Sequence, residues 1–151
     1  MRIVDFEPRH APDWRRLNEA WIGRHFALEP ADEIVLGDPV GAVIAPGGHI
    51  FMAETAAGEA VGCAGLKAMD DGGFEVIKMT VAEAARGAGL GRLLLQACID
   101  RARLSGAPRL YLETNSGLGP ALGLYRAMGF VDLPRRETPY ARADVFMALR
   151  L

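Results

Sequence analysis

The sequence predicts one α+β domain, residues 1–151, built on a mostly antiparallel sheet with a single strand–helix–strand crossover. Three observations lead to this fold class. The length suits one hydrophobic core, and half of the residues are hydrophobic, which is too many for a disordered chain. The middle of the chain contains short apolar runs separated by tight-turn sequences, as antiparallel strands do. After this middle part of the chain, strand-like and helix-like segments alternate, as a crossover requires.

The N-terminal part predicts a strand followed by helices. Residues 2–6 form the expected strand, and Pro12 suits a first helical turn because its missing N–H is not needed there. Apolar residues then recur at helical spacing over about four turns, and we assign their aromatic members mainly to the core: Trp14, Leu17, Trp21, Ile22 and Phe26. A second short helix is expected at 30–38. Residues 41–48 are expected to form a loop, because Pro46-Gly47-Gly48 interrupts regular structure.

Three strands connected by tight turns are expected next, at 50–54, 61–68 and 74–81. The turn sequences are Ala57-Gly58-Glu59 and Asp70-Asp71-Gly72-Gly73, so the strands form an antiparallel meander.

The C-terminal half predicts the crossover. A helix begins near Gly89 and is ended by Gly106 and Pro108. Its apolar face is expected to consist of Leu90, Leu93, Leu94, Ala97 and Cys98. The remaining elements are a strand at 110–113, a helix at 120–128 closed by Gly129, and a strand at 145–149.

Charge is distributed unevenly along the chain. Residues 1–85 hold 14 acidic and 7 basic residues, whereas residues 86–151 hold 10 basic and 5 acidic residues. Nucleic-acid-binding proteins usually carry clustered basic charge, and a net charge of −2 argues against nucleic acid as a partner. The asymmetry suits an anionic cofactor with a cationic substrate, or it is a chance segregation of surface charge. Both readings stay open.

No apolar run approaches the roughly 18 residues of a membrane span, so no membrane partner is expected. The first seven residues contain no apolar signal segment, and we therefore expect a cytoplasmic protein. Cys63 and Cys98 lack disulfide or zinc spacing. The three histidines lack the spacing of metal ligands, so no metal is expected.

A glycine-rich turn after the strand at 74–81 carries the strongest chemical signal. Gly87, Gly89 and Gly91 leave backbone N–H groups unshielded at the start of a helix, which suits a pyrophosphate. Arg86 and Arg92 flank this turn with permanent positive charge. A P-loop requires a lysine after its glycines, and a Rossmann turn requires a different glycine spacing directly after its strand, so neither motif matches.

The turn resembles motif A of the GNAT acetyltransferase superfamily, [Arg/Gln]-x-x-Gly-x-[Gly/Ala], which is matched by Arg86-x-x-Gly89-x-Gly91. Downstream, Asn115 and Ala121-Leu-Gly-Leu-Tyr125-Arg-Ala-Met-Gly129-Phe130 resemble the superfamily's motif B. The resemblance covers Phe74 to Val131. It implies a GNAT-like mixed, mostly antiparallel sheet flanked by helices on both faces.

The resemblance implies acetyl-CoA as acetyl donor, bound where the strands at 74–81 and 110–113 splay apart. Its pantetheine arm would pair with the strand edge formed by Met79, Thr80 and Val81. Its pyrophosphate would accept N–H bonds between Arg86 and Arg92, from Gly87, Ala88, Gly89, Leu90 and Gly91. Asn115 would hydrogen-bond the cofactor arm or cap the next helix.

The same resemblance implies the catalytic groups. Tyr125 occupies the position of the superfamily's general acid and would also contact the cofactor. A phenol with a pKa near ~10 can protonate a thiolate whose conjugate acid has a pKa near ~8.5. The alternative for Tyr125 is a packing role on an apolar helix. Glu75 stands where some members place a general base; the alternatives are a salt bridge to Lys78 and an exposed strand position. A backbone N–H near Met79 would hold the oxyanion.

Together these features predict an acetyl-CoA-dependent N-acetyltransferase, a transferase of EC 2.3.1 type, that acts by direct attack of a primary amine in a ternary complex. A non-catalytic acyl-CoA sensor and an O-acyltransferase are the alternatives. The acceptor is a small-molecule amine or a peptide or protein amine, expected to approach from the acidic half near Glu29, Asp32 and Glu33. If the enzyme prefers an anionic amine instead, arginines such as Arg142 become the candidates for holding its carboxylate. A homodimer is compatible with the sequence, which does not indicate an oligomeric state.

Overall fold

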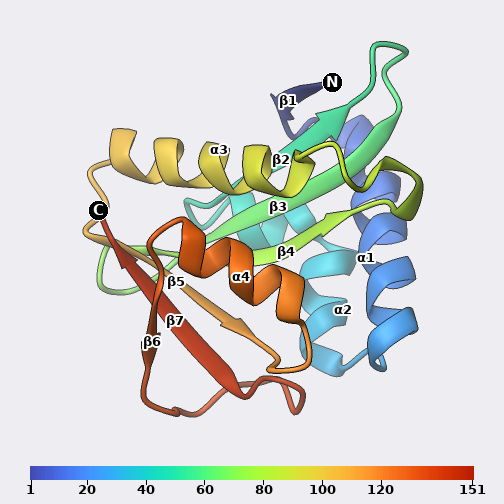
Figure 1. Ribbon diagram of the computed structural model, residues 1–151. Coiled ribbons are helices and arrows are strands. Elements are labelled where there is room, and N and C mark those ends of the chain that lie inside the picture. The colour runs from blue at the N-terminus through green and yellow to red at the C-terminus, as the bar shows by residue number, and fades with distance from the viewer.

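The computed structural model describes residues 1–151 and contains one seven-stranded sheet in the order β1-β2-β3-β4-β5-β7-β6 (Figure 1). The strands are β1 (Arg2–Asp5), β2 (His49–Glu54), β3 (Ala60–Ala68), β4 (Phe74–Val81), β5 (Arg109–Thr114), β6 (Val131–Leu133) and β7 (Val145–Arg150). Every neighbouring pair is antiparallel except β4 and β5. The predicted sheet with a single parallel crossover is therefore confirmed.

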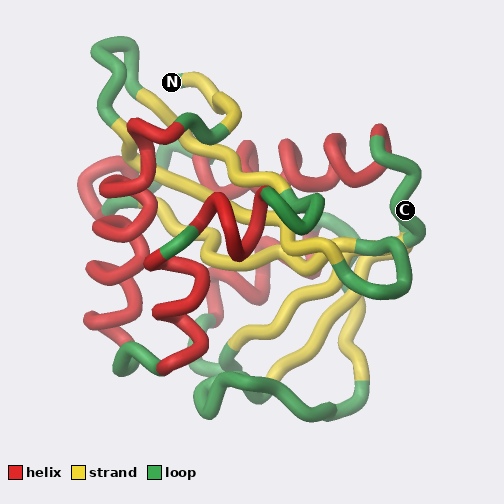
Figure 2. Tube along the Cα trace, turned by 180° about the vertical axis from the view of Figure 1, so that it is seen from behind, coloured by secondary structure: helices red, strands yellow, loops and turns green.

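Helices cover both faces of this sheet, as predicted. They are α1 (Ala11–His25), α2 (Pro30–Gly37), α3 (Leu90–Leu104) and α4 (Gly119–Ala127), with single turns at Pro8–His10, Val40–Ile44 and Glu83–Ala85. Figure 2 shows α1 and α2 together on one face, whereas α3 and α4 lie on the face seen in Figure 1. The helix α3 connects β4 to its parallel neighbour β5. None of the helices combines the length and the apolar character that a membrane crossing requires.

Two local expectations are corrected by the structure. Val40–Ile44 form a wide helical turn where a loop was expected from residue 41 onward, and the Ala45 N–H donates to the Val40 carbonyl. Val43 is buried by this turn, so tertiary packing outweighs the nearby Pro-Gly-Gly signal. The strand β6 was not predicted, because a three-residue edge strand is too short to show an alternating pattern.

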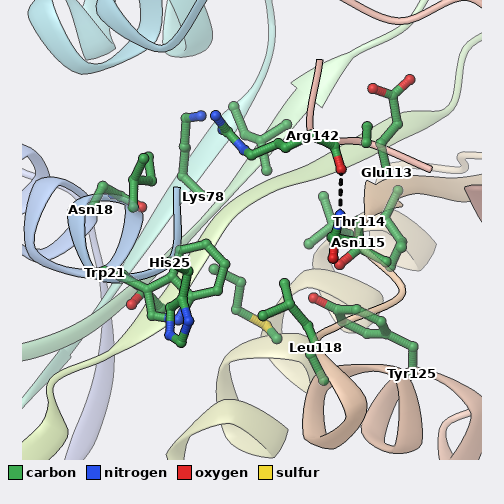
Figure 3. Close-up of a pocket in the computed structure, with 18 of the residues that line it drawn as sticks. Asn18, Trp21, His25, Lys78, Glu113, Thr114, Asn115, Leu118, Tyr125 and Arg142 are labelled. Atoms are coloured by element: carbon green, nitrogen blue, oxygen red, sulfur yellow. Dashed lines mark hydrogen bonds between the residues drawn. The ribbon is translucent and has the colours of Figure 1, made fainter. Parts of the chain in front are cut away.

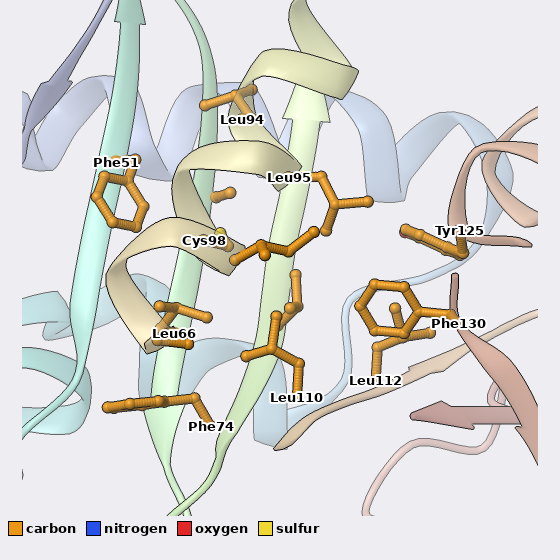
Figure 4. Close-up of a cluster of buried hydrophobic side chains, with 14 of the residues drawn as sticks. Phe51, Leu66, Phe74, Leu94, Leu95, Cys98, Leu110, Leu112, Tyr125 and Phe130 are labelled. Atoms are coloured by element: carbon orange, nitrogen blue, oxygen red, sulfur yellow. The ribbon is translucent and has the colours of Figure 1, made fainter. Parts of the chain in front are cut away.

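The core consists of two hydrophobic clusters, one on each side of the sheet. The larger holds 20 buried residues between the sheet and the helices α3 and α4 (Figure 4). The smaller holds 10 and lies beneath α1 and α2. Trp14 belongs to the smaller cluster, is fully buried, and donates its indole N–H to the Val35 carbonyl at 3.0 Å. This contact fixes α1 to α2, and it confirms Trp14 as a core residue.

The buried face of α3 differs from the predicted face at one position. Its buried side chains are Leu90, Leu94, Leu95, Cys98, Ile99 and Ala102. Leu93, which was expected among them, is 49% exposed. It lies about 100° around the helix from Leu94, on the side away from Leu95. The buried arc is therefore rotated toward Leu95, which a pattern of leucines at 90, 93 and 94 does not reveal.

This difference predicts unequal effects of the same truncation at adjacent positions. We expect Leu94→Ala to lower the free energy of unfolding by about 2–5 kcal/mol, because it leaves a cavity in the larger cluster. Leu93→Ala, the matched control, should change it by no more than about 0.5 kcal/mol. Urea unfolding of both variants measures the effect, and equal losses would contradict the observed face.

Candidate functional site

The strands β4 and β5 are paired only at their beginnings. Phe74 pairs with Leu110 and Glu75 with Tyr111, and beyond these two pairs the strands diverge (Figure 1). β4 stays paired with β3, and β5 stays paired with β7. The inner edges of β4 and β5 therefore face a cavity of about 560 Å³, which α1, α4 and the segment before β7 also line. The predicted divergence of these strands is confirmed.

Most of the predicted site residues gather around this cavity. Those that line it are Glu75, Met79, Thr80, Val81, Arg86, Gly91, Asn115 and Tyr125. The others lie next to it, in the turn that leads into α3 and in the first turn of that helix: Gly87, Ala88, Gly89, Leu90 and Arg92.

The glycine-rich turn presents a row of free donors at the N-terminus of α3. Gly87 and Gly89 have φ values of +85° and +76°, a left-handed conformation that glycine adopts readily. The N–H groups of Gly87, Ala88 and Gly89 have no acceptor in the protein. The first helical N–H groups also lack intrahelical acceptors. A turn of this kind can hold a phosphate group.

The two arginines beside this turn form no ion pair with the protein. Arg86 donates one N–H, from Nε, to the Val81 carbonyl at 3.3 Å, which holds its side chain along the end of β4. Arg92 is exposed on the first turn of α3. Their positive charges are therefore available to an anion at the turn.

Tyr125 presents a free hydroxyl to the cavity (Figure 3). Its helix ends at Ala127, Gly129 turns the chain with a φ of +101°, and the Phe130 N–H donates to the Tyr125 carbonyl at 3.0 Å. The two rings lie 6.0 Å apart, so Gly129 and Phe130 fix the position of Tyr125. Burial, with a smaller contribution from Cys98, raises the pKa of Tyr125 to about 12. The phenol is therefore protonated at neutral pH and has a proton to donate.

Glu75 also faces the cavity and forms no hydrogen bond or ion pair. Burial first, and the nearby negative charge of Glu113 second, raise its pKa to about 7. The predicted alternative, a salt bridge from Glu75 to Lys78, is wrong, because the Lys78 ammonium pairs with Asp32 instead. Glu75 therefore has no direct partner for its charge, and the longer-range effects of Lys67 and Lys78, which lower its pKa, are outweighed.

The sequence did not predict a cation cluster on the opposite side of the cavity. β4 carries a bulge in which Lys78 and Met79 together oppose Ala64 of β3, and Lys78 has a φ of +53°. The Lys78 ammonium donates to the buried carboxylate of Asp32, in the first turn of α2. Arg142, which precedes β7, donates two N–H groups to the same carboxylate at 2.7 and 2.9 Å.

Asp32 connects three separate segments. It is fully buried and accepts four hydrogen bonds: one from Lys78, two from Arg142 and one from the Glu29 backbone N–H. Burial alone would raise its pKa, but the hydrogen bonds from Arg142 and Lys78 outweigh burial and hold the pKa well below its usual range. Asp32 is therefore a permanent structural anion.

This arrangement corrects the expected role of the acidic residues around α2. Glu29 pairs with Arg142 at 3.1 Å, and the exposed Glu33 pairs with Arg15 at 2.8 Å. Since Asp32 is also saturated, none of the three carboxylates is free to attract a cationic acceptor. The acidic surplus of residues 1–85 is partly consumed in these internal ion pairs.

Asn115 connects the two halves of the cavity wall. Its amide N–H donates to the Arg142 carbonyl at 2.8 Å, the dashed line in Figure 3, and its amide oxygen accepts from the Gly117 N–H. The next helix has no side-chain cap, so the predicted capping alternative is wrong. Trp21 and Phe26 pack against the smaller hydrophobic cluster, as their predicted core role requires, and their rings, 6.0 Å apart, also line the cavity.

The sequence model of the Acetyltransferase (GNAT) family matches residues 6–130. Among curated relatives, the IAA acetyltransferase of Azospirillum brasilense is 39% identical over 83 residues, which cover 54% of this chain and 54% of that protein. The chain spans about half the length of the curated relatives it matches.

Solved structures share the fold across the whole chain. An acetyltransferase of the GNAT family from Staphylococcus aureus MU50 superposes with a TM-score of 0.89 and 18% identity, covering 99% of this chain and 98% of that one. The Salmonella typhimurium protein yncA, solved with its cofactor acetyl-CoA, gives a TM-score of 0.78 and 24% identity, covering 99% and 93%.

The environment of Glu75 predicts its titration. We expect its carboxyl group to titrate near pH 7, and Glu113→Gln to lower that pKa by removing a like charge. Glu83→Gln, which alters an exposed carboxylate paired with Arg24, should leave it unchanged. Carbon-detected NMR of labelled glutamate carboxyls measures the pKa of Glu75 in the wild-type protein and in both variants. A wild-type pKa below about 5 would contradict the buried, unpaired environment.

Proposed function

The chain belongs to the GNAT acetyltransferase family, and on that premise we propose that it transfers the acetyl group of acetyl-CoA directly to a primary amine. One observation carries the proposal. A phenol and a carboxylate, those of Tyr125 and Glu75, face the same cavity, and neither has a partner in the protein. Neither group is among the buried polar atoms that lack a hydrogen-bond partner, so both can be reached from the cavity and are available to a bound substrate.

The residues around the glycine-rich turn fit acetyl-CoA. The pyrophosphate would accept hydrogen bonds from the free N–H groups of Gly87, Ala88 and Gly89, beside the charges of Arg86 and Arg92. The edge of β4 beyond Glu75 has no strand beside it, so its peptide groups at Met79 to Val81 can pair with the amides of the pantetheine arm.

The cavity's free acid and base match the proton transfers of a direct reaction. The amine nitrogen must lose a proton as it bonds to the acetyl carbon, and the sulfur must gain one as its bond to that carbon breaks. Glu75, with a pKa near 7, accepts the first proton. Tyr125 donates the second. The burial that raises the pKa of Tyr125 also raises that of a thiolate leaving into the same cavity.

A non-catalytic acyl-CoA sensor would need the anion site at the turn but not the free acid and base. In a sensor, the unpaired Glu75 carboxylate would destabilise the fold without benefit. An O-acyltransferase would use the same cavity with a hydroxyl acceptor. Release of free thiol from acetyl-CoA, measured with a panel of amines and alcohols, separates the three functions.

Replacement of Gly89 tests the anion site. We expect Gly89→Glu to abolish acetyl-CoA binding, because it places a carboxylate where the pyrophosphate would lie. Gly106→Glu is the matched control, since Gly106 has nearly the same φ, +75°, and equally open space at the far end of α3. Calorimetry with acetyl-CoA should show binding lost only in the first variant. Equal affinities in both variants would refute the anion site.

Removal of one hydroxyl tests the general acid. We expect Tyr125→Phe to bind acetyl-CoA normally while kcat falls roughly 100-fold, the scale of general-acid catalysis. The ring remains packed on Phe130, so stability should change little. Stopped-flow thiol release checks that chemistry limits the rate. An unchanged chemical rate would leave Tyr125 with a packing role only.

A further inference from the structure

We propose that the acceptor is an α-amino acid with an apolar side chain, whose carboxylate binds between Arg142 and Lys78 while its amine faces Glu75. This inference rests on the proposed function and specifies its substrate class. Four features of the cavity support it: a free guanidinium fork, a second cation with an unused N–H, an unpaired carboxylate, and an apolar wall.

The first feature is the unused edge of Arg142. Its Nη1 donates to Glu29 and Asp32, and its Nη2 gives one N–H to Asp32. Its Nε–H and the second Nη2–H have no acceptor in the protein. These two N–H groups point the same way from one edge of the planar guanidinium, which matches the two oxygens of a carboxylate.

This unused edge is accessible. The only buried side-chain polar atom without a partner in the whole structure is Oε1 of Glu54, on β2. Since Nε of Arg142 has no partner and is not among such buried atoms, solvent can reach it. Arg142 lines the cavity, and only 16% of its side chain is exposed, so an anion would reach the fork in a largely desolvated place.

The second feature is Lys78. Its ammonium has three N–H groups, and Asp32 and the Tyr140 hydroxyl, at 3.4 Å, accept two of them. The ring centroid of Tyr140 lies 4.7 Å from the Lys78 ammonium and 4.6 Å from the Arg142 guanidinium, so both cations rest on one ring. Figure 3 shows the two side chains pointing toward one another.

The charges within this cluster balance. Lys78 and Arg142 are paired with the two carboxylates of Asp32 and Glu29. Asp32 is fully buried and already accepts four hydrogen bonds. The unused N–H groups of the two cations, rather than a net charge, therefore offer a carboxylate its binding site.

The remaining features suit the rest of an amino acid. Glu75 and Glu113 line the cavity where β4 and β5 begin to diverge, and Glu113 is held by the hydroxyls of Tyr111, at 2.8 Å, and Thr138. Negative charge therefore lies near the expected thioester, where an ammonium group must arrive. The apolar wall comes from the last turns of α1 and the residue that follows it: Trp21, Ile22 and Phe26.

Three acceptors that differ only at the carboxylate test the inference: L-leucine, L-leucinamide and 3-methylbutylamine. We expect kcat/KM for leucine to exceed that for each of the others at least 10-fold. The amino group of leucinamide has a lower pKa than that of leucine and is more often neutral at pH 7.5. Intrinsic reactivity therefore favours leucinamide, which makes the test stringent. A leucinamide or 3-methylbutylamine value equal to that of leucine would overturn the inference.

Arg142→Lys tests the fork itself. Lysine keeps a positive charge beside Asp32 but lacks the paired N–H groups. We expect the KM for leucine to rise about 10- to 100-fold, as for loss of a charged hydrogen bond. The ratio of kcat/KM for leucine to kcat/KM for leucinamide, the acid-over-amide ratio, should fall toward one. Arg103→Lys, an exposed arginine without an ion pair on α3, should preserve the ratio. An unchanged ratio in Arg142→Lys would refute the role of the Arg142 guanidinium. If this variant does not fold, the comparison of the three acceptors with the wild-type protein still tests the inference.

Equilibrium binding separates this inference from the proposed function. Saturation-transfer NMR measures leucine and leucinamide binding without any reaction. Leucine binding that depends on Arg142, in a protein that releases no thiol with any amine, would support the carboxylate site between Arg142 and Lys78 but refute the proposed function, and with it the role of the amino acid as acceptor. The opposite result is thiol release in which leucine is preferred over leucinamide neither in kcat/KM nor in binding. That result would refute the inference and leave the proposed function standing.

Discussion

The early end of the pairing between β4 and β5 is the constraint on which the rest of the site depends. After Glu75 and Tyr111 the two strands share no ladder, although each stays paired with its outer neighbour. The break leaves two strand edges facing a cavity, at the N-terminus of α3 and beside Tyr125 of α4. Continued pairing would satisfy those backbone groups internally and close the space in which a cofactor arm can pair.

The cofactor side of the site could be predicted from the sequence because local backbone geometry determines it. Gly87 and Gly89 adopt left-handed conformations that expose successive N–H groups, and this requirement appears directly as glycine spacing. Gly129, with a φ of +101°, ends α4 so that Phe130 packs on Tyr125. Each of these signals acts within a few residues, and the alternation of strand and helix patterns predicted the fold for the same reason.

The acceptor side could not be predicted, because contacts between distant segments create it. Asp32 meets Lys78 across 46 positions and Arg142 across 110, and the bulge that directs Lys78 leaves no local signal. The helical spacing of Trp21 correctly predicted its packing against the core, but spacing does not reveal that the same side chain also forms a cavity wall. The acidic surplus of residues 1–85 misled the prediction of a cationic acceptor for a similar reason. Ion pairs inside the fold cancel charges that a count along the sequence treats as free.

The two sides also differ in how they hold charge. The turn before α3 offers backbone dipoles that need no counter-charge, whereas the acceptor side holds real charges whose desolvation must be offset. Asp32 and Glu29 together offset the desolvation of the two cations, whereas Glu75 has no direct partner and is compensated only at longer range by Lys67 and Lys78. Asn115 joins the sides, since its amide holds the backbone of Arg142 beside the loop that leads to Tyr125. Three more hydrogen bonds join the same two segments, since the N–H and hydroxyl of Ser116 donate to the Asp144 carboxylate and the Asp144 N–H donates to the Thr114 carbonyl. A shift of either wall would therefore move the guanidinium fork relative to the phenol, so the geometry of the acceptor site and that of the general acid are coupled through this set of hydrogen bonds.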